Sequence, residues 1–139
     1  MREARTRDEV EHALALRFRV FCDEQGVDRA AEQDGRDDEA IHLVAVRRGR
    51  LVGTCRLLVD GGTVRLGRNA VASSERGRGI GTALLRAADA VAAGTGADRI
   101  RLHAQLAATA LYERSGYLAE GATFLEEGIE HVTMEKRLA

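Results

Sequence analysis

Apolar residues recur at helical spacing near the start of the chain. Four of them are separated by four, four and three residues, which puts them on one face of a helix. They are Val10, Leu14, Phe18 and Phe21. Thr6 and Glu9 have the spacing of a capping box, in which the Thr6 hydroxyl caps the Glu9 amide and the Glu9 side chain reaches back. The pattern predicts a helix that begins after Thr6 and ends near Gly26.

The rest of the chain alternates between extended and helical patterns. Residues 28–39 are acidic and have no period, so an exposed loop is expected there. Three extended segments separated by glycine turns then predict an antiparallel meander. The expected elements are strands at 41–46, 51–59 and 64–72, a helix at 79–93, a strand at 100–105, a helix at 107–114, and strands at 117–124 and 131–138. Helices interleaved with a mixed sheet indicate a layered α/β fold, not a doubly wound parallel sheet.

The composition is that of an ordinary globular chain, with 139 residues, 45% hydrophobic residues and a formal net charge of −1. This length predicts one domain, residues 1–139. The balanced charge gives no field that would attract nucleic acid or a membrane surface, and no long apolar run is present, so a cytoplasmic protein is expected. Cys22 and Cys55 form no CxxC motif and have no histidine at metal-ligand spacing, so buried reduced thiols and no metal site are expected.

Residues 76–82, RGRGIGT, join a predicted strand to the longest predicted helix. Glycines without a Cβ let consecutive amides converge, and the free amides and positive dipole of the helix N-terminus point the same way. Arg76, Arg78 and the Thr82 hydroxyl add positive charge and a donor. The segment is therefore a candidate site for a phosphate or pyrophosphate.

Three other interpretations of this turn are open. A P-loop needs a lysine, and the turn contains none. A dinucleotide fingerprint needs a further glycine where Leu84 stands, and it opens a βαβ unit rather than following a meander. The third is a glycine-rich turn that only caps a helix, although three alternate glycines and two arginines exceed what a cap requires.

The same residues resemble the phosphate loop of the GNAT superfamily of N-acetyltransferases, [QR]-x-x-G-x-[GA], through Arg76, Gly79 and Gly81. Residues 105–117, QLAATALYERSGY, resemble the second signature of that family, which ends in LYE-x-x-G-[FY]. Finer features resemble the ElaA-like branch of the family. They lie at 20–21, 24–25, 40–42, 102–105 and 127–131. The resemblance covers residues 6–138.

The resemblance implies a single-domain fold with a mixed, mostly antiparallel sheet of six to seven strands flanked by helices. The first strand of such a sheet has only residues 1–5 available, so it should be short or frayed. Two central strands should splay apart, which exposes unpaired N–H and C=O groups. Acetyl-CoA is the implied co-substrate.

The resemblance also implies how the coenzyme is held. The amides of residues 76–82 would bind the pyrophosphate, and the edge at 71–73 would pair with the pantetheine arm like an extra strand. An amide near Val71 would face the thioester oxygen and stabilise the oxyanion of the tetrahedral intermediate. Gln105 stands where the family more often has Asn, and it would either bond the pantetheine or cap the strand end. The expected coenzyme-binding residues are Val71, Ser73, Arg76, Gly77, Arg78, Gly79, Ile80, Gly81, Thr82 and Gln105.

The catalytic residues are less clearly marked. Tyr112 stands where this family has a general acid that protonates the departing thiolate, or it only packs against the sheet. The attacking amine must be neutral, so a proton acceptor is also expected. The candidates are Glu24 at the end of the first helix, His103 on a strand beside the cleft, and His131, which could line the acceptor pocket with Glu127. The expected site has Tyr112 and Glu24 as catalytic residues and His103 and His131 as substrate-binding residues.

The expected activity is direct transfer of the acetyl group to a primary amine of a small molecule, by a monomer or homodimer. A covalent acyl-enzyme is not expected, because neither cysteine lies near a recognisable His/Asp pair. The acidic run with Asp34, Asp37, Asp38 and Glu39 is either a solvated surface or an attraction for a cationic amine. Alternatives from other classes are a non-catalytic acyl-CoA sensor and a nucleotide-binding oxidoreductase or kinase.

Overall fold

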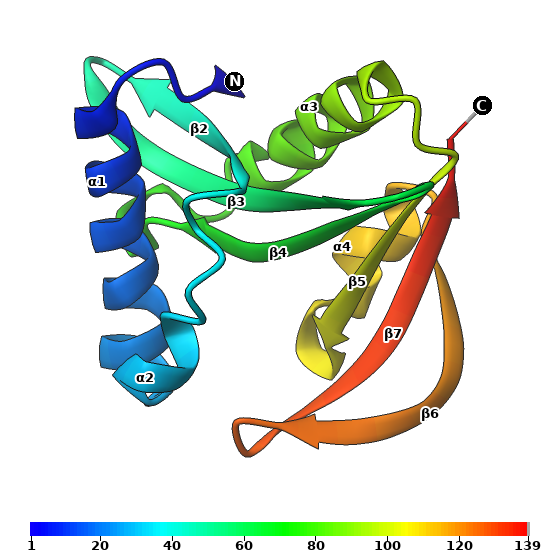
Figure 1. Cartoon of the computed structure of the whole chain (residues 1–139). Helices are drawn as coiled ribbons and strands as arrows, with labels where there is room; N and C mark the ends of the chain where they lie inside the picture. The colour runs from blue at the N-terminus through cyan, green and yellow to red at the C-terminus, as the bar shows by residue number, and fades with distance from the viewer. Residues whose placement is uncertain (139) are drawn as a thin grey trace.

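The structure, a computed structural model, describes residues 1–138 (Figure 1). Its centre is a sheet with the strand order β1-β2-β3-β4-β5-β7-β6. β4 and β5 are parallel, and the other neighbouring strands are antiparallel. The strands are β1 (Arg2–Glu3), β2 (Ile41–Arg47), β3 (Arg50–Asp60), β4 (Thr63–Val71), β5 (Arg99–Gln105), β6 (Leu118–Glu126) and β7 (Ile129–Arg137). The predicted fold class is confirmed, including the short first strand.

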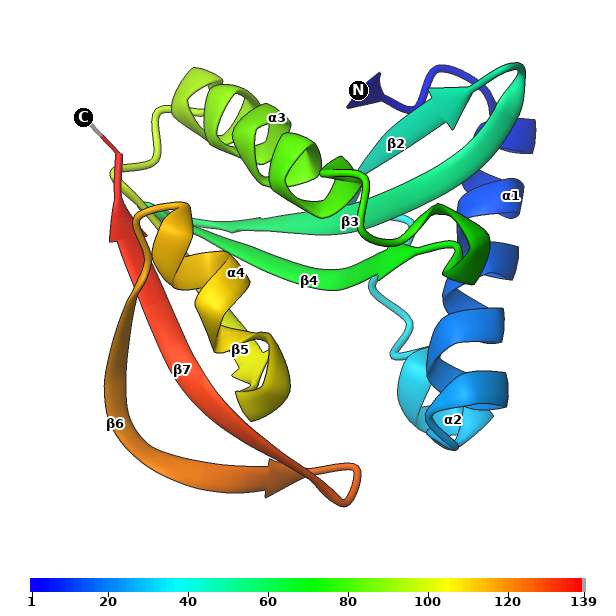
Figure 2. The same cartoon turned by 180° about the vertical axis from the view of Figure 1, so that it is seen from behind.

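Helices cover both faces of the sheet. α1 packs on β2, β3 and β4 from one side and α3 packs on them from the other (Figures 1 and 2). The helices are α1 (Arg7–Arg17), which continues as a π-helical stretch (Phe18–Glu24), α2 (Arg29–Glu32), α3 (Ile80–Gly94) and α4 (Thr109–Arg114). Within residues 1–138, no helix has the length and apolar character needed to cross a bilayer.

The start of α1 follows from its capping residues. The Glu9 amide donates to the Thr6 hydroxyl at 3.1 Å, as predicted. The Glu9 carboxylate reaches back one residue further than a capping box requires and accepts from the Arg5 amide at 2.8 Å. It also pairs with Arg2 of β1. The hydrogen bond with Arg2, followed by the one from Arg5, lowers the pKa of Glu9 to about 2, so the carboxylate that caps α1 also ties β1 to it.

The buried face of α1 differs from the predicted stripe. Ala13, Leu16 and Val20 are buried, and the last two pack with Ala70 of β4. Arg17 is fully buried on the same face. The four residues of the predicted stripe are only partly buried, because the helix presents the neighbouring row of residues to the sheet.

The larger core lies between the sheet and α3. The residues of α3 that it buries are Ile80, Leu84, Leu85, Ala88 and Ala92. α3 approaches β3 closely at Gly53, where a Cβ would meet side-chain atoms of Ile80 at 3.0 Å and of Leu84 at 3.1 Å. A side chain at this position would therefore push α3 away from the strand, which explains why a glycine interrupts an otherwise apolar strand.

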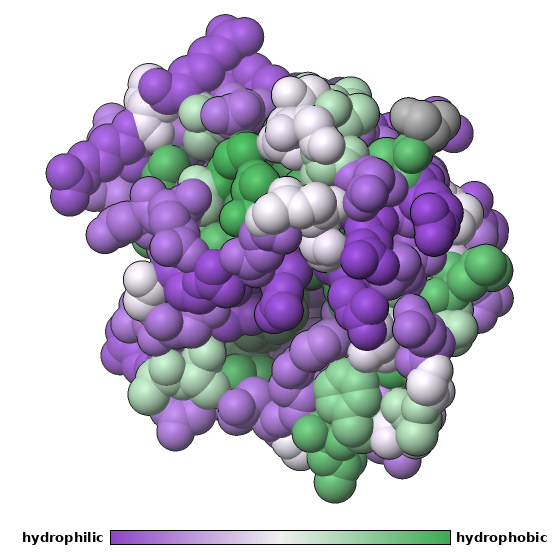
Figure 3. All heavy atoms as spheres, turned by 45° about the vertical axis from the view of Figure 1, so that its right-hand side comes forward, coloured by the Kyte–Doolittle hydropathy of each residue, from purple (hydrophilic) through white to green (hydrophobic). Residues whose placement is uncertain are grey.

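Polar side chains cover most of the face seen in Figure 3, with smaller apolar areas between them. Leu118 and Leu125 of β6 are the most exposed large apolar side chains, at 76% and 71%. β6 lies at the edge of the sheet, and its pairing with β7 is shifted between Glu120 and Phe124. This irregularity bends the strand, which makes its edge a poor template for another strand.

The segment predicted as an exposed loop is held against the protein by ion pairs. Arg17 donates to Glu32 of α2 at 2.7 Å and to Asp37 at 2.8 Å. Arg56 of β3 binds Asp34 through two bonds of 2.8 Å each. The prediction of a solvated loop is therefore wrong in part: residues 29–32 form α2, and Glu32 is only 4% exposed. Arginines from distant parts of the chain pair with Glu32 and with Asp34 and Asp37, which follow α2.

These pairs predict that the protein loses stability in acid. The hydrogen bonds from Arg56 hold the pKa of Asp34 well below its usual range. Burial raises the pKa of Asp37, but hydrogen bonds and charge from Arg17 and Arg56 outweigh it and the net pKa is lowered. A carboxyl with a lowered folded pKa stabilises the fold above its unfolded value, about 3.9 for aspartate, and that contribution is lost as pH falls further.

We expect the free energy of unfolding, measured by urea denaturation, to fall between pH ~5 and pH ~2. Asp34→Asn should make this fall smaller by roughly 1–2 kcal/mol, the scale of one charged hydrogen-bond pair near a surface. Asp8→Asn, which changes an exposed aspartate in the first turn of α1, is the matched control. An equal pH dependence in the wild type and Asp34→Asn would contradict this expectation.

Candidate active site

β4 and β5 lie side by side over only part of their length. Their pairing runs from Thr63 opposite Arg99 to Leu66 opposite Leu102 and stops there. β4 then has a bulge at Arg68, whose φ of 54° lies in the left-handed region. Beyond the bulge the two strands diverge, as Figure 1 shows, so the predicted splay is confirmed.

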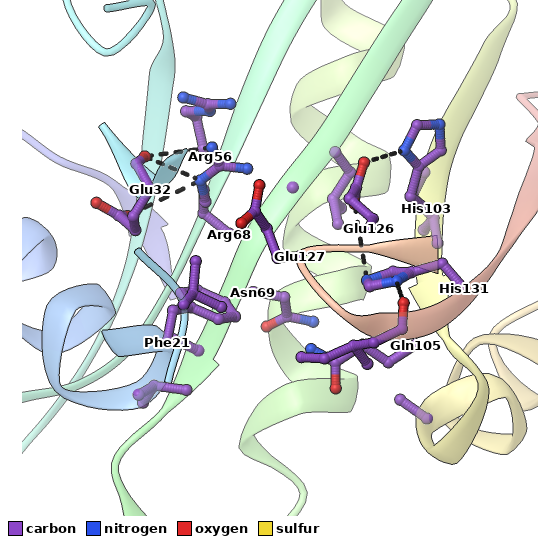
Figure 4. A pocket seen from close by; sticks show the side chains of 18 of the residues that line it. Phe21, Glu32, Arg56, Arg68, Asn69, His103, Gln105, Glu126, Glu127 and His131 are labelled. Carbon is purple, nitrogen blue, oxygen red and sulfur yellow. Dashed lines mark hydrogen bonds and ion pairs between the residues drawn. The ribbon is translucent and has the colours of Figure 1, made fainter. Parts of the chain in front are cut away.

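The opening between the strands contains a cavity of about 700 Å³. Its walls come from the π-helical stretch, β4, β5, α4 and the β6–β7 hairpin (Figure 4). The predicted site residues that line it are Val71, Arg76, Gly81, His103, Gln105, Tyr112 and His131. Residues predicted separately on four segments of the sequence are thus brought to one cavity. Glu24 and Ser73 lie outside its lining in the described part of the chain.

A second cavity of about 450 Å³ adjoins the first at the turn before α3. Both cavities are lined by Val71, Arg76 and Gly81, so the two meet at these residues. The predicted coenzyme-binding residues that line the second cavity alone are Gly77, Gly79, Ile80 and Thr82.

The backbone of this turn leaves its amides available. Gly77 and Gly79 have φ values of 79° and 81°, which glycine adopts without strain. α3 begins at Ile80, so the first amides of the helix have no acceptor in a preceding turn. Among residues 1–138, no protein acceptor receives a hydrogen bond from the amides of residues 77–82. Unpaired amides at the positive end of a helix dipole form a site for an anion.

The two arginines of the turn are not free charges. Arg76 donates from Nε to the Val71 carbonyl at 3.1 Å and forms an ion pair with Glu24 at 2.8 Å. Arg78 lies 3.6 Å from Glu75. The structure thus gives Glu24 a partner that sequence spacing did not indicate, and the unpaired groups at the turn are mainly backbone amides.

Two histidines face one carboxylate on the other side of the main cavity (Figure 4). His103 Nδ1 lies 3.0 Å from Glu126 Oε1, and His131 Nε2 lies 3.7 Å from Glu126 Oε2. His131 Nδ1 lies 2.7 Å from the Ile129 carbonyl oxygen, and the His131 ring stacks on Phe124 at a centroid distance of 6.0 Å. His131 is buried and His103 is exposed.

Tyr112 reaches the main cavity from α4 and is 8% exposed. Burial raises the pKa of its hydroxyl, while the nearby Asn69 amide opposes this rise. The phenol therefore keeps its proton at neutral pH and can donate it. Its ring also packs edge-on against Tyr117, with 5.9 Å between the ring centroids.

Gln105, at the end of β5, closes one end of the opening. Its side-chain amide donates to the Gln25 side-chain oxygen at 2.8 Å, which links β5 to the end of the π-helical stretch. Within residues 1–138, no three His, Cys, Asp or Glu side chains are grouped to hold a metal ion.

A family model described as an acetyltransferase (GNAT) domain matches residues 4–138. The chain belongs to the GNAT acetyltransferase family. The predicted enzyme class, an acetyl-CoA-dependent acyltransferase, is confirmed by this membership.

Individual GNAT relatives span nearly the whole chain. YjcF of Bacillus subtilis (strain 168), described as an uncharacterized N-acetyltransferase, is 32% identical and covers 96% of this chain and 96% of its own. The structure of an acyl-CoA N-acyltransferase from Pseudomonas aeruginosa is 34% identical, covers 95% of this chain and 92% of its own, and has a TM-score of 0.85. Escherichia coli ElaA is 24% identical with a TM-score of 0.85 over 95% of this chain and 92% of its own, a likeness in fold.

Several residues of this GNAT cavity were not found from the sequence. Asn69 reaches the cavity beside the bulge at Arg68, and no local pattern indicates a bulge there. Glu127 and His131 both line the cavity, as the sequence analysis expected, but the carboxylate within ion-pair distance of the His131 ring is Glu126, one position earlier. The turn residues Glu127 and Gly128 both have positive φ, 51° and 72°. Recognising them as the two central residues of a hairpin turn would have placed Glu126 at the end of β6, beside β7.

Proposed function

We propose that this chain binds acetyl-CoA along the two joined cavities and transfers its acetyl group directly to a primary amine of a small molecule. The observation that supports this most strongly is that the two cavities adjoin, one at the unpaired amides of residues 77–82 and the other in the opening between β4 and β5. A diphosphate at the turn would accept hydrogen bonds from its unpaired amides, and an amide-rich arm between β4 and β5 would pair with the open edges of these strands.

In this proposal the edge of β4 pairs with the pantetheine arm. The Ala72 amide donates to the Val52 carbonyl of β3 at 2.8 Å. Because N–H groups alternate in direction along a strand, the Val71 amide points away from β3, toward the opening. It is then available to the thioester oxygen, where an amide donor stabilises the oxyanion of the tetrahedral intermediate. The edge does not extend to Ser73 as predicted, because Ser73 begins a short 3₁₀ helix (Ser73–Glu75) and lies outside the cavity lining. Gln105 would approach the arm from β5.

Direct transfer is favoured over a covalent acyl-enzyme. Burial raises the pKa of the Cys55 thiol to about 12, so it is a poor nucleophile at neutral pH. Burial also raises the pKa of Cys22, which is partly buried rather than fully buried as predicted. Tyr112 is proposed as the general acid for the departing thiolate, since it is buried, protonated and on the cavity wall.

The acceptor is proposed to enter beside His103 and His131, which line the other end of the main cavity. Glu24 is engaged by Arg76, and this contact would have to open before Glu24 accepted a proton. Its proposed part is therefore to hold Arg76 at the mouth of the turn. The cytoplasmic location and the monomeric or homodimeric state remain predictions from the sequence.

Release of free thiol from acetyl-CoA across a panel of primary amines tests the proposal. We expect turnover with at least one amine and a kcat about 100-fold lower for Tyr112→Phe, the usual scale of general acid catalysis, with unchanged CoA affinity. Tyr117→Phe is the matched control, because the Tyr117 hydroxyl has no hydrogen-bond partner within residues 1–138. Tight CoA binding without turnover on any amine would favour the non-catalytic sensor instead.

A further inference from the structure

The contacts of His131 select one tautomer of its neutral ring. A carbonyl oxygen can only accept, so the 2.7 Å contact with Ile129 requires that His131 Nδ1 carries the proton. The neutral ring then has its lone pair on Nε2, which faces the cavity side where Glu126 lies at 3.7 Å. Stacking on Phe124 fixes the plane of the ring. The only unprotonated nitrogen of His131 is thus directed by three contacts rather than left free to turn.

Glu126 is held in turn by His103. A carboxylate accepts, so His103 donates its Nδ1 proton to Glu126 Oε1 at 3.0 Å. The second oxygen, Oε2, remains on the side of His131. The Ile129 carbonyl orients the buried His131 ring through Nδ1. Glu126 lies on the side of Nε2, between this ring and the exposed ring of His103, where its negative charge would stabilise a charged His131.

Resting on the proposed function, we propose that His131 Nε2 accepts the proton of the attacking amine, and that Glu126 is the positioning residue that stabilises the charged ring. The base is thereby assigned to one of three candidates. Glu24 is occupied by Arg76 and lies outside the cavity lining, and His103 is the outer, exposed ring. Glu126 receives a role that the sequence patterns did not give it.

The step balances without a further reactant. The amine nitrogen attacks the thioester carbonyl carbon, and the C–N bond forms as electrons move onto the carbonyl oxygen. His131 Nε2 takes one proton from the nitrogen as positive charge develops there. The C–S bond then breaks, and the thiolate takes a proton from Tyr112, which regains it from water. His131 releases its proton to water, so that one proton has moved from nitrogen to sulfur overall.

Several charged groups lie on the strands around His131, and some of them are paired with one another. Arg101, further along β5, is engaged by Glu135 at 2.9 Å, and Lys136 pairs with Asp89. The charged or titratable side chains on the neighbouring strands and their turn are Arg99, Arg101 and His103 on β5, Glu120 and Glu126 on β6, Glu127 in the hairpin turn, and Glu130, Glu135, Lys136 and Arg137 on β7. Glu126 is the one that an ion-pair distance links to the ring.

The test uses the amine that the wild-type chain acetylates fastest from a panel of an alkylamine, a polyamine, an amino sugar and an amino acid amide. His131→Asn keeps a donor near the Ile129 carbonyl but removes the base, and we expect kcat to fall about 100-fold or more with CoA affinity unchanged. His103→Asn keeps a donor to Glu126, and we expect less than a tenfold loss. His12→Asn, an exposed position on α1, is the control.

Glu126→Gln tests the charge of Glu126 through the kcat–pH profile, which would not shift if Glu126 had only a structural role. Loss of the carboxylate should move the acid limb of the kcat–pH profile to lower pH and reduce kcat about tenfold, because a charged ring is no longer stabilised. This variant lies on an exposed strand and keeps the test open if His131→Asn does not fold. Wild-type kcat in a folded His131→Asn, or an unmoved acid limb in Glu126→Gln, overturns the proposal while the acetyltransferase assignment stands. Absence of turnover by the wild type overturns both.

Discussion

Gly79→Asp should weaken CoA binding by roughly 100-fold or more while the protein remains folded. Gly79 precedes the first residue of α3 with φ of 81°, and a Cβ there would meet no other atom within 4 Å. The new carboxylate therefore fits, but it stands beside the amides proposed to hold the pyrophosphate. Two unit charges about 4 Å apart at an effective dielectric constant of about 20 repel by ~4 kcal/mol, which is more than a 100-fold change in affinity.

Two controls separate charge from backbone strain. Gly79→Asn has nearly the same shape and the same backbone demand without the charge, so its CoA affinity should fall much less. Gly49→Asp places the same residue at a similar φ, 74°, in the turn between β2 and β3, where again nothing lies within 4 Å. It should leave CoA affinity unchanged. Isothermal titration of the three variants measures this, and equal weakening by Gly79→Asp and Gly79→Asn would show that charge at the turn is irrelevant.

Arg17→Met should lower the free energy of unfolding by about 3–5 kcal/mol, the cost of breaking a buried ion pair. The substitution leaves the Glu32 carboxylate only 4% exposed and without the guanidinium that lies 2.7 Å away. It also removes a donor from Asp37. Because these pairs fasten α2 against α1, the segment from α2 to β2 should loosen first, as amide hydrogen exchange would detect.

Arg7→Met is the matched control for this measurement. Arg7 lies in the first turn of the same helix, 3.7 Å from Glu11, and its side chain is 93% exposed. Such an exposed pair contributes about 0–1 kcal/mol, so chemical denaturation should hardly change. Adding Glu32→Leu to Arg17→Met should recover part of the loss, because no uncompensated charge then remains in the interior. A loss below ~1 kcal/mol for Arg17→Met alone would contradict the account of the loop.

The sequence predicted what depends on local order. Glycine turns, period-two strands and the α3 pattern are local signals, and the strands and helices they predicted are present within one to three residues at most ends. The turn at residues 76–82 could be recognised as a candidate anion site because such a site depends on consecutive amides. These features require no knowledge of which distant residues meet.

Other features depend on contacts between residues far apart in the chain. The acidic segment looked solvated because Arg17 and Arg56, which neutralise it, come from α1 and β3. Arg17 also occupies a position in the buried face of α1, and a pattern of hydrophobic residues cannot predict a buried arginine. Likewise, Glu126 meets His103 only because β5, β6 and β7 are adjacent in the sheet. Pairing across a sheet has to be known before such a cluster can be recognised.

We propose that the two adjoining cavities, from the turn before α3 to the opening between β4 and β5, hold acetyl-CoA. A crystal structure of the chain grown with CoA tests it most directly. We expect the pyrophosphate oxygens within hydrogen-bond distance of the amides of residues 77–82, and the pantetheine arm between β4 and β5 with its sulfur near Tyr112. Coenzyme density elsewhere on the surface, with those amides bound only to water, would contradict the account.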